Sequence, residues 1–383
     1  MAGPREIDAG REPTAEPADE PSRDGAHTAH VGFLQRPVLA FSAAALVAVI
    51  VILGLASSLS FQGDEWAYIV DRRLTIESML LPHNEHLVFL HVLVYRGLVE
   101  LVGTGSYLPF LIVLMACHVA MAAGVYALMR RVVSIEASLG AAVLMLFLGS
   151  GFDNLVWAFQ IGFVGAAAFG VWALVVADRS AACAALLTAA LWTQGNGLFF
   201  LAPAAVLMTQ RRWLLLPVGS YAAWFLAVGR ESIPLPTAGP FLDYAARLAG
   251  SVVGGAAGFG PGAGLIILGL VAAGLVVQRT RPSRFVVAGI VGLASQMVIL
   301  AVGRAHFGAA QAEAPRYIYI ALPFVLMTLT GLHRVRREVW AGAFALSLVL
   351  NIWALPRGVA IYHAFLNYDR SIPLEQRLAP LRR

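Results

Sequence analysis

The chain has 383 residues, of which 59% are hydrophobic and only 13% are charged. A soluble globular protein has about 45–50% apolar and about 25% charged residues, so the composition excludes an ordinary soluble enzyme. The net charge is +5, and every basic side chain is an arginine. The arginines lie in short segments between apolar runs, which is typical of membrane topology signals, so we expect no nucleic-acid partner.

The fold class follows from continuous apolar runs of roughly 17–23 residues that recur along the chain. In lipid, a helix satisfies its own backbone hydrogen bonds. A transmembrane barrel is disfavoured because the runs do not alternate between apolar and polar residues. Cys117 and Cys183 lie within the runs, so we expect packing roles and neither a disulfide framework nor a zinc site. The sequence predicts an all-α polytopic membrane protein with about eleven transmembrane helices, plus interfacial helices in its first external loop.

Residues 1–30 are rich in Pro, Glu, Asp, Arg, Gly and Ala and lack an apolar period, so we expect a disordered tail. This tail is too long and too acidic for the start of a signal peptide, and no cleavage is expected. Residues 31–356 are then predicted to form the transmembrane domain, beginning with a span over Val38–Leu59. Because Arg36 precedes this span, the N-terminus is predicted to be cytoplasmic.

The densest polar stretch, Phe61–His91, follows the first span directly and belongs to a predicted external loop over residues 60–106. Within this loop Leu87–Val102 is largely apolar but is only about 16 residues long and contains a histidine, an arginine and a glutamate. Each charge at the centre of a spanning helix costs about 2.5–3.5 kcal/mol. We therefore interpret this segment as an interfacial helix on the outer surface.

The remaining topology is predicted from arginine clusters, which mark cytoplasmic helix ends. Residues 181–208 are long for one span and short for two, and the polar break Thr193–Gly197 interrupts them. Because arginines flank both ends, we interpret them as two short helices with an outer turn. A single tilted span would invert everything downstream. A second interfacial helix is expected at 241–254, and an external tail at 357–383. Further spans are predicted at 107–129, 137–149, 155–177, 213–228, 262–277, 285–302, 318–332 and 339–355.

With this topology, the polar residues outside the arginine clusters gather on the outer side, where any active site is expected. Asp64 and Glu65 stand at the mouth of the first span and are the candidate catalytic residues. One of them could act as a general base toward a sugar or lipid hydroxyl. The alternative is a solvated pair at a helix N-terminus, which the helix dipole favours by about 0.3–1 kcal/mol.

His83, Glu85 and His86 are candidate substrate-binding residues in the segment PHNEH. The two histidines could share a metal if they lay on one helical turn. Three clustered ligands do not define a metal site, so we predict no cofactor, although a divalent metal would be compatible with these ligands. The favoured interpretation is a turn that caps the next helix, with Asn84 as the cap.

Further candidates for substrate binding are arginines and amides on the predicted outer side. Arg72 and Arg73 could pair with a phosphate, or equally hold lipid headgroups. Gln194 and Asn196 could bind a sugar, or satisfy backbone groups that the helix break frees. Arg304 lies in the loop that follows residue 302.

Arg316 and Tyr317 open a later span from the outer side. The arginine could clamp a phosphate, and the tyrosine could sit in the aromatic belt. The alternative is ordinary anchoring at the membrane interface.

The order of these features resembles the GT-C superfamily of membrane glycosyltransferases, which includes protein O-mannosyltransferases and aminoarabinose transferases. That family has an acidic residue or pair just after its first span, matched here by Asp64 and Glu65 in GDEWAY. An external loop with interfacial helices follows, and a later span often opens with Arg-Tyr, matched by Arg316 and Tyr317 in APRYIYIALP. The similarity covers residues 38–355. The chain departs from the family in having no soluble C-terminal domain and no longer signature after GDEWAY.

The resemblance implies transfer of a sugar from a polyprenyl-phosphate donor to a lipid, glycan or protein acceptor of the cell envelope, in a bacterial plasma membrane. Asp64, or less favourably Glu65, would deprotonate the acceptor hydroxyl, which attacks the anomeric carbon as polyprenyl phosphate leaves. Arginines would neutralise the leaving phosphate; the candidates are Arg316, Arg72, Arg73 and Arg304. The multi-pass chain would contact membrane lipids and end outside the cell.

Two rival functions remain open. A flippase or transporter of lipid-linked saccharides would also use broken helices, but should carry polar residues along both halves of the membrane. A non-catalytic subunit of a membrane assembly is the other alternative. It predicts that Asp64→Ala leaves any associated activity intact.

Overall fold

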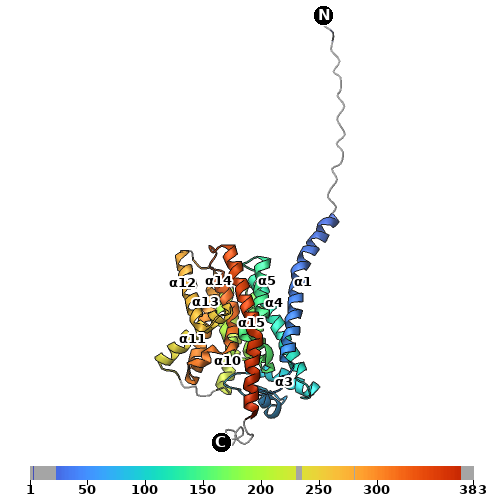
Figure 1. Ribbon diagram of the computed structural model, residues 1–383, viewed down its shortest axis with the longest axis vertical. Coiled ribbons are helices and arrows are strands. Elements are labelled where there is room, and N and C mark those ends of the chain that lie inside the picture. Colours follow the sequence, from blue (N-terminus) through green and yellow to red (C-terminus); the bar gives the residue numbers. More distant parts are fainter. Residues whose placement is uncertain (1–2, 4–22, 230–234, 280, 372–383) are drawn as a thin grey trace. The chain divides into compact units, whose positions relative to one another are not determined.

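The computed structural model describes residues 3, 23–229, 235–279 and 281–371. Contacts divide the chain into residues 1–40 and 41–383, and the second unit contains the helices that concern function. Within the described residues the chain is helical and has no strand (Figure 1). The elements are α1 Arg23–Ala56, η1 Ala67–Asp71, α2 Ile76–Leu80, α3 Phe89–Val102, α4 Leu108–Met129, α5 Ile135–Leu146, η2 Gly149–Gly151, α6 Asp153–Val156, η3 Ala158–Gln160, α7 Ile161–Val175, α8 Ser180–Thr193, η4 Gly195–Phe200, α9 Leu201–Leu207, η5 Arg211–Leu214, α10 Leu215–Ala227, α11 Ala238–Ala257, α12 Pro261–Val277, α13 Arg284–Arg304, η6 Ala305–Phe307, η7 Ala309–Glu313, α14 Pro315–Leu329 and α15 Arg337–Ser371.

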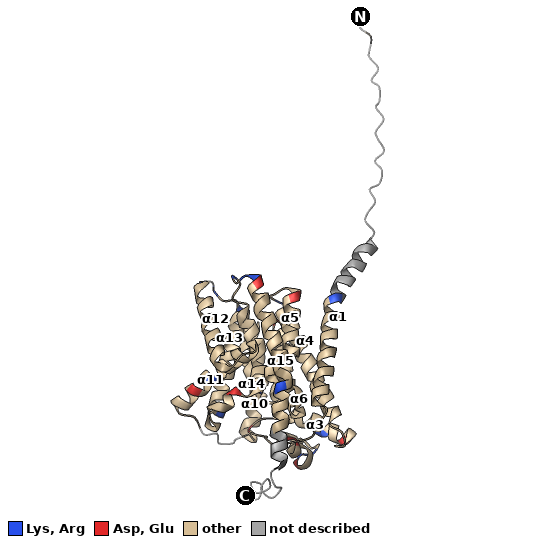
Figure 2. Cartoon of the chain, in the orientation of Figure 1, with Lys and Arg blue, Asp and Glu red and all other residues tan. Residues whose placement is uncertain are grey.

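Five described helical segments are long and apolar enough to cross a membrane, and a bent pair, α11 with α12, makes up to six. Charged residues gather toward the ends of these helices, with a largely uncharged band between them (Figure 2). The fold is therefore that of an all-α membrane protein, as the composition predicts. The five segments are Arg36–Ala56, Leu108–Met129, Ala158–Val175, Arg284–Phe307 and Arg337–Ala364.

Length and composition alone do not give the eleven spans that the sequence predicts. Helices occur at the other predicted positions, but α5, α8, η4 with α9, and α14 are shorter apolar segments. The 15 residues of α14 rise about 22 Å, against a hydrocarbon core of about 30 Å.

The stretch predicted as two short helices is a helical hairpin. The Ser180 hydroxyl, at the start of α8, accepts a hydrogen bond from the backbone N–H of Gln210, which follows α9, at 3.1 Å. The chain thus enters and leaves at the same end, so the two-helix interpretation is confirmed. Gly197 permits the reversal, because a Cβ there would lie 2.7 Å from the carbonyl carbon of Ala190. The turn at the far end begins at Gln194.

The helix predicted at 241–254 is the first arm of a bent pair, and its interfacial position stays a prediction. Helices α11 and α12 meet at 89° across a short glycine-rich break. Gly258 at this break has φ +84°, a conformation that favours glycine. Asn351 and Ser347 of α15 donate hydrogen bonds to the carbonyl of Ala256, so α15 satisfies backbone groups that the end of α11 leaves free.

Both predicted tails differ in extent from the described structure. Helix α1 begins at Arg23, inside the stretch predicted as disordered, and residues 1–2 and 4–22 lie outside the described residues. Helix α15 continues past Arg357 to Ser371, where the sequence predicts an external tail. Leu355 and Val359 are buried, so packing against the bundle extends this helix. Residues 372–383 lie outside the described part.

Candidate functional site

Glu65 is completely buried behind the loop that follows α1. Its Oε1 accepts hydrogen bonds from the hydroxyls of Tyr95 at 2.6 Å and Tyr107 at 2.9 Å, and its Oε2 accepts from the backbone N–H of Gln62 at 2.8 Å. Burial raises the pKa of this carboxyl to about 7, while the hydrogen bonds from Tyr95, Gln62 and Tyr107 oppose the rise. Tyr107 also accepts from the backbone N–H of Ala158, so Glu65 connects the loop to α4 and η3.

Asp64, the adjacent acid, has a different environment. Its side chain is 45% exposed, and its Oδ2 lies 3.8 Å from His83 Nε2. The same oxygen accepts a hydrogen bond from the Asn84 side chain at 3.3 Å. The pKa of Asp64 is lowered, chiefly by its interaction with His83. Partial burial raises this pKa, whereas Asn84 and Arg316 lower it further. Asp64 is therefore an ionised, accessible carboxylate at neutral pH.

The segment PHNEH forms a tight two-residue turn. His83 and His86 exchange backbone hydrogen bonds of 3.1 Å and 3.0 Å, and they form an isolated β-bridge. Asn84 and Glu85 between them have φ +47° and +71°, the positive values that a type I′ turn requires at both central positions. The prediction of a turn is confirmed. The prediction that Asn84 caps the next helix is wrong, because α3 begins after Val88.

This turn also separates the two histidines. His83 lies beside Asp64, whereas the His86 ring packs elsewhere, so the two do not share a helical turn as a metal pair would. Among the described residues no group of three or more His, Cys, Asp or Glu side chains could hold a metal ion.

His86 joins three distant segments. Its Nε2 lies 2.9 Å from Nη2 of Arg304, at the end of α13, and accepts a hydrogen bond from it. Burial, together with the charge of Arg304, lowers the pKa of His86 to about 3, so the ring is neutral and can accept this bond. On its other side the ring faces Gly195, where a Cβ would lie 2.4 Å from His86 Nδ1. Arg304 also lies 3.9 Å from Glu85.

Arg316, at the start of α14, acts electrostatically on Asp64 and Asp153. It lowers the pKa of Asp64, and it opposes the rise that burial imposes on the pKa of Asp153. Its guanidinium lies 5.5 Å from the ring centre of Tyr317. Tyr317 itself is buried in the core, so its ring is unavailable to an aromatic belt at the surface.

Arg72 and Arg73 are not brought together with the acids. Arg72 is buried, and its guanidinium donates to the backbone carbonyls of Ser78, Leu81 and Pro82 at 2.7, 3.0 and 2.6 Å. It therefore holds the loop in shape. Arg73 is exposed, and its backbone N–H donates a hydrogen bond to the Ser78 hydroxyl at 2.9 Å.

Gln194 and Asn196 are both buried at the hairpin turn. The Asn196 amide donates to the carbonyl of Phe163 at 2.9 Å. The side-chain oxygens of Gln194 and Asn196 have no hydrogen-bond partner within the described residues. The turn is therefore tied to α7 and still has free acceptors.

A buried polar cluster lies around the predicted residue His83, and its other members were not among the predicted site residues. The rings of His83 and His91 pack edge-on against Tyr68, at 4.9 and 4.7 Å between ring centres. Within the described residues, the Tyr68 hydroxyl, both His91 nitrogens and both polar atoms of Gln160 are buried without a hydrogen-bond partner. The side-chain nitrogen and oxygen of Asn154 are likewise buried without a hydrogen-bond partner among the described residues. Gln160 could have been singled out from the sequence, because it is a polar residue inside the apolar run 155–177.

Comparison with known protein families, curated proteins and solved structures gave no match.

Proposed function

We propose that this protein is a membrane glycosyltransferase that moves a sugar from a polyprenyl-phosphate donor to an acceptor hydroxyl of the cell envelope. One observation carries the proposal: Asp64 is an ionised, accessible carboxylate at the mouth of the first span, and the charge of Arg316 lowers its pKa. A base and a phosphate-binding cation at one site are what transfer from a phosphate-linked donor requires.

In this proposal Asp64 accepts the proton of the acceptor hydroxyl. The hydroxyl oxygen forms the new bond to the anomeric carbon, and the bond from that carbon to the phosphate oxygen breaks. Arg316 stabilises the charge that develops on the leaving phosphate. His83, 3.8 Å from Asp64, helps keep the carboxylate ionised.

The contacts favour Asp64 over Glu65 as the base. Glu65 has no exposed surface, and three donors already occupy its oxygens. We assign it a positioning role, because it holds the loop against Tyr95 and Tyr107. Arg72 is likewise assigned to the loop, so Arg316 remains the principal phosphate ligand.

We further propose that the shorter helices also cross the membrane, giving about eleven crossings with the site at the outer leaflet. Support comes from the helix ends, which contact two separate groups of loops. At one end Trp224 of α10 donates to the carbonyl of Leu80 at 2.8 Å, beside the site loop. At the other, Arg131 lies 3.7 Å from Asp178, and Arg284 donates to the carbonyl of Met208 at 3.2 Å. The second group carries the arginine clusters, as cytoplasmic loops do.

The test is sugar transfer from radiolabelled polyprenyl-phosphate sugars in membranes that contain the full chain. Asp64→Asn should abolish transfer, because an amide cannot accept the proton. Arg316→Gln should reduce transfer by about 10²–10³, the loss typical of removing one group that stabilises developing charge. Asp71→Asn is the matched control, since Asp71 is an exposed acid in the same loop. Wild-type transfer by Asp64→Asn would refute the proposal.

A flippase for lipid-linked saccharides is the second candidate, and the bent pair α11–α12 favours it. Broken helices recur at the binding sites of transporters, and these two helices meet at 89°. A flippase would move a fluorescent lipid-linked saccharide between leaflets of a vesicle without forming a product. Translocation that persists in Asp64→Asn, together with no transfer by the wild type, would favour this alternative.

A further inference from the structure

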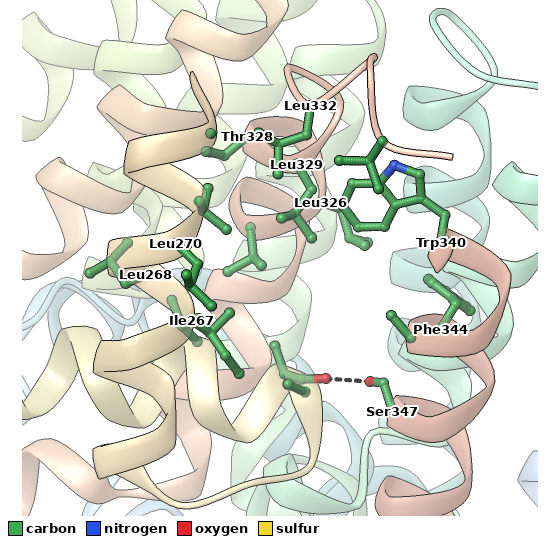
Figure 3. A pocket seen from close by; sticks show the side chains of 18 of the residues that line it. Ile267, Leu268, Leu270, Leu326, Thr328, Leu329, Leu332, Trp340, Phe344 and Ser347 are labelled. Carbon is green, nitrogen blue, oxygen red and sulfur yellow. Dashed lines mark hydrogen bonds between the residues drawn. The ribbon is translucent and has the colours of Figure 1, made fainter. Parts of the chain in front are cut away.

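A groove of about 720 Å³ opens on the side of the bundle between α12, α14 and α15. Its walls are almost entirely aliphatic and aromatic. Side chains from all three helices point into it, among them Leu270, Leu326 and Phe344 (Figure 3). Leu270 is 68% exposed, so this wall faces the surroundings of the bundle and does not lie in its core.

The two ends of the groove carry different groups. At one end, the Ser347 hydroxyl donates to the Ala256 carbonyl at 2.7 Å, where α11 stops (Figure 3). At the other end, the arginine-rich end, lie Trp340, Gln278 and Arg334, next to the arginine-rich loops.

The arginine-rich end of the groove has polar groups that an apolar occupant alone would not need. Arg334 is exposed, and no described carboxylate lies within salt-bridge distance of it. Arg336 nearby differs, because it pairs with Glu338 at 3.3 Å. Gln278 is buried in the wall, and its Oε1 has no hydrogen-bond partner in the described part of the chain.

We infer that the groove binds one anionic phospholipid from the leaflet at the arginine-rich end. An acyl chain fills the apolar groove, the phosphate pairs with Arg334, and a headgroup hydroxyl donates to Gln278 Oε1. Since lipid tails are as apolar as leucine, the chain gains little by leaving the bilayer. Selectivity comes from the headgroup charge, as in other basic sites between transmembrane helices. This inference is independent of the proposed glycosyl transfer.

Native mass spectrometry of the purified full chain in detergent tests it, with phosphatidylglycerol and phosphatidylcholine added in equal amounts. Phosphatidylglycerol should be retained in preference. Arg334→Gln should lower its retention about fivefold, the factor equivalent to about 1 kcal/mol per arginine near a lipid headgroup. Arg336→Gln is the matched control, because it makes the same charge change in the same loop but does not line the groove. It should retain the lipid as the wild type does.

A second variant tests the apolar part of the site. Val271→Trp places a large ring in the groove and should remove bound lipid from a protein that stays monodisperse. Equal retention of the two lipids would overturn the proposal, as would equal losses in Arg334→Gln and Arg336→Gln. The proposal would also be overturned if Val271→Trp retained as much lipid as the wild type does. A wild-type dimer that binds no lipid would overturn it as well.

Discussion

Gly195 provides the sharpest test of how the site is assembled. It is the first residue of η4, at the hairpin turn after α8, and it packs on the ring of His86, which is 109 positions earlier in the chain. An added Cβ would lie 2.4 Å from His86 Nδ1 and 3.0 Å from Cε1 and Cγ. Gly195→Ala therefore forces the ring and the turn apart.

The cost follows from what holds the ring. His86 cannot simply swing away, because its Nε2 accepts a hydrogen bond from Arg304. Overpacking of this kind costs about 1–3 kcal/mol. Removing the ring removes the clash, so Gly195→Ala should be nearly harmless in a chain that already carries His86→Ala. The double-mutant cycle should give a coupling energy of about 1–3 kcal/mol, with the double variant more stable than additivity predicts.

Thermal unfolding in detergent measures this, with a thiol-reactive dye that reports exposure of Cys117 and Cys183. We expect a melting temperature for Gly195→Ala at least about 2 °C below that of the wild type. Gly219→Ala is the control: among the described residues, nothing beyond its chain neighbours and its own helix backbone lies within 4 Å of the added Cβ, and alanine favours the helix. A neutral Gly195→Ala, or additive effects of the two substitutions, would refute the contact between the two segments.

Three further variants test buried polar groups. The folded-state pKa of Glu65 is raised to about 7 from 4.5, so its contribution to stability is complete below about pH 4.5 and is lost as pH rises through 7. The unfolding free energy of the wild type should therefore change with pH by about 3 kcal/mol, and Glu65→Gln should remove this change. If the melting temperatures of the wild type and Glu65→Gln depended on pH in the same way from pH 5 to 8, the prediction would be contradicted. Asn351→Leu should cost about 2–3 kcal/mol, because Asn351 accepts from the backbone of Ser150 and donates to the carbonyls of Ala256 and Ser347. Ser347→Ala loses one hydrogen bond and should cost about 1 kcal/mol in the same melting experiment, so equal losses would argue against a network centred on Asn351.

Several local features were predictable because nearby residues encode them. Gly195 and Gly197 interrupt an apolar run between arginines, and the structure has a hairpin there. His83–His86 was predictable as a turn from its polar composition. The length of α15 was not predictable from Arg357, because buried contacts of Leu355 and Val359 extend the helix past that charge.

The roles of individual polar residues were much less predictable. Asp64 and Glu65 are adjacent and chemically alike, yet one is accessible and the other has no exposed surface. Arg72 and Arg316 are both arginines in polar stretches, but Arg72 is used by three backbone carbonyls of its own loop. The interactions that separate these roles involve partners up to 252 positions away in the sequence, as in the electrostatic effect of Arg316 that lowers the pKa of Asp64.

The sequence by itself determined that this is an all-α membrane protein, because a bilayer leaves helices as the means for long apolar runs to satisfy their backbone groups. It also determined that the densest polar stretch follows the first span. Only the tertiary structure decided that Asp64 lies beside His83, where Arg316 also lowers its pKa, while Glu65 is buried against Tyr95 and Tyr107. The physical reason is that burial and charge environment depend on which distant segments pack together, and hydropathy along the chain carries no record of that packing.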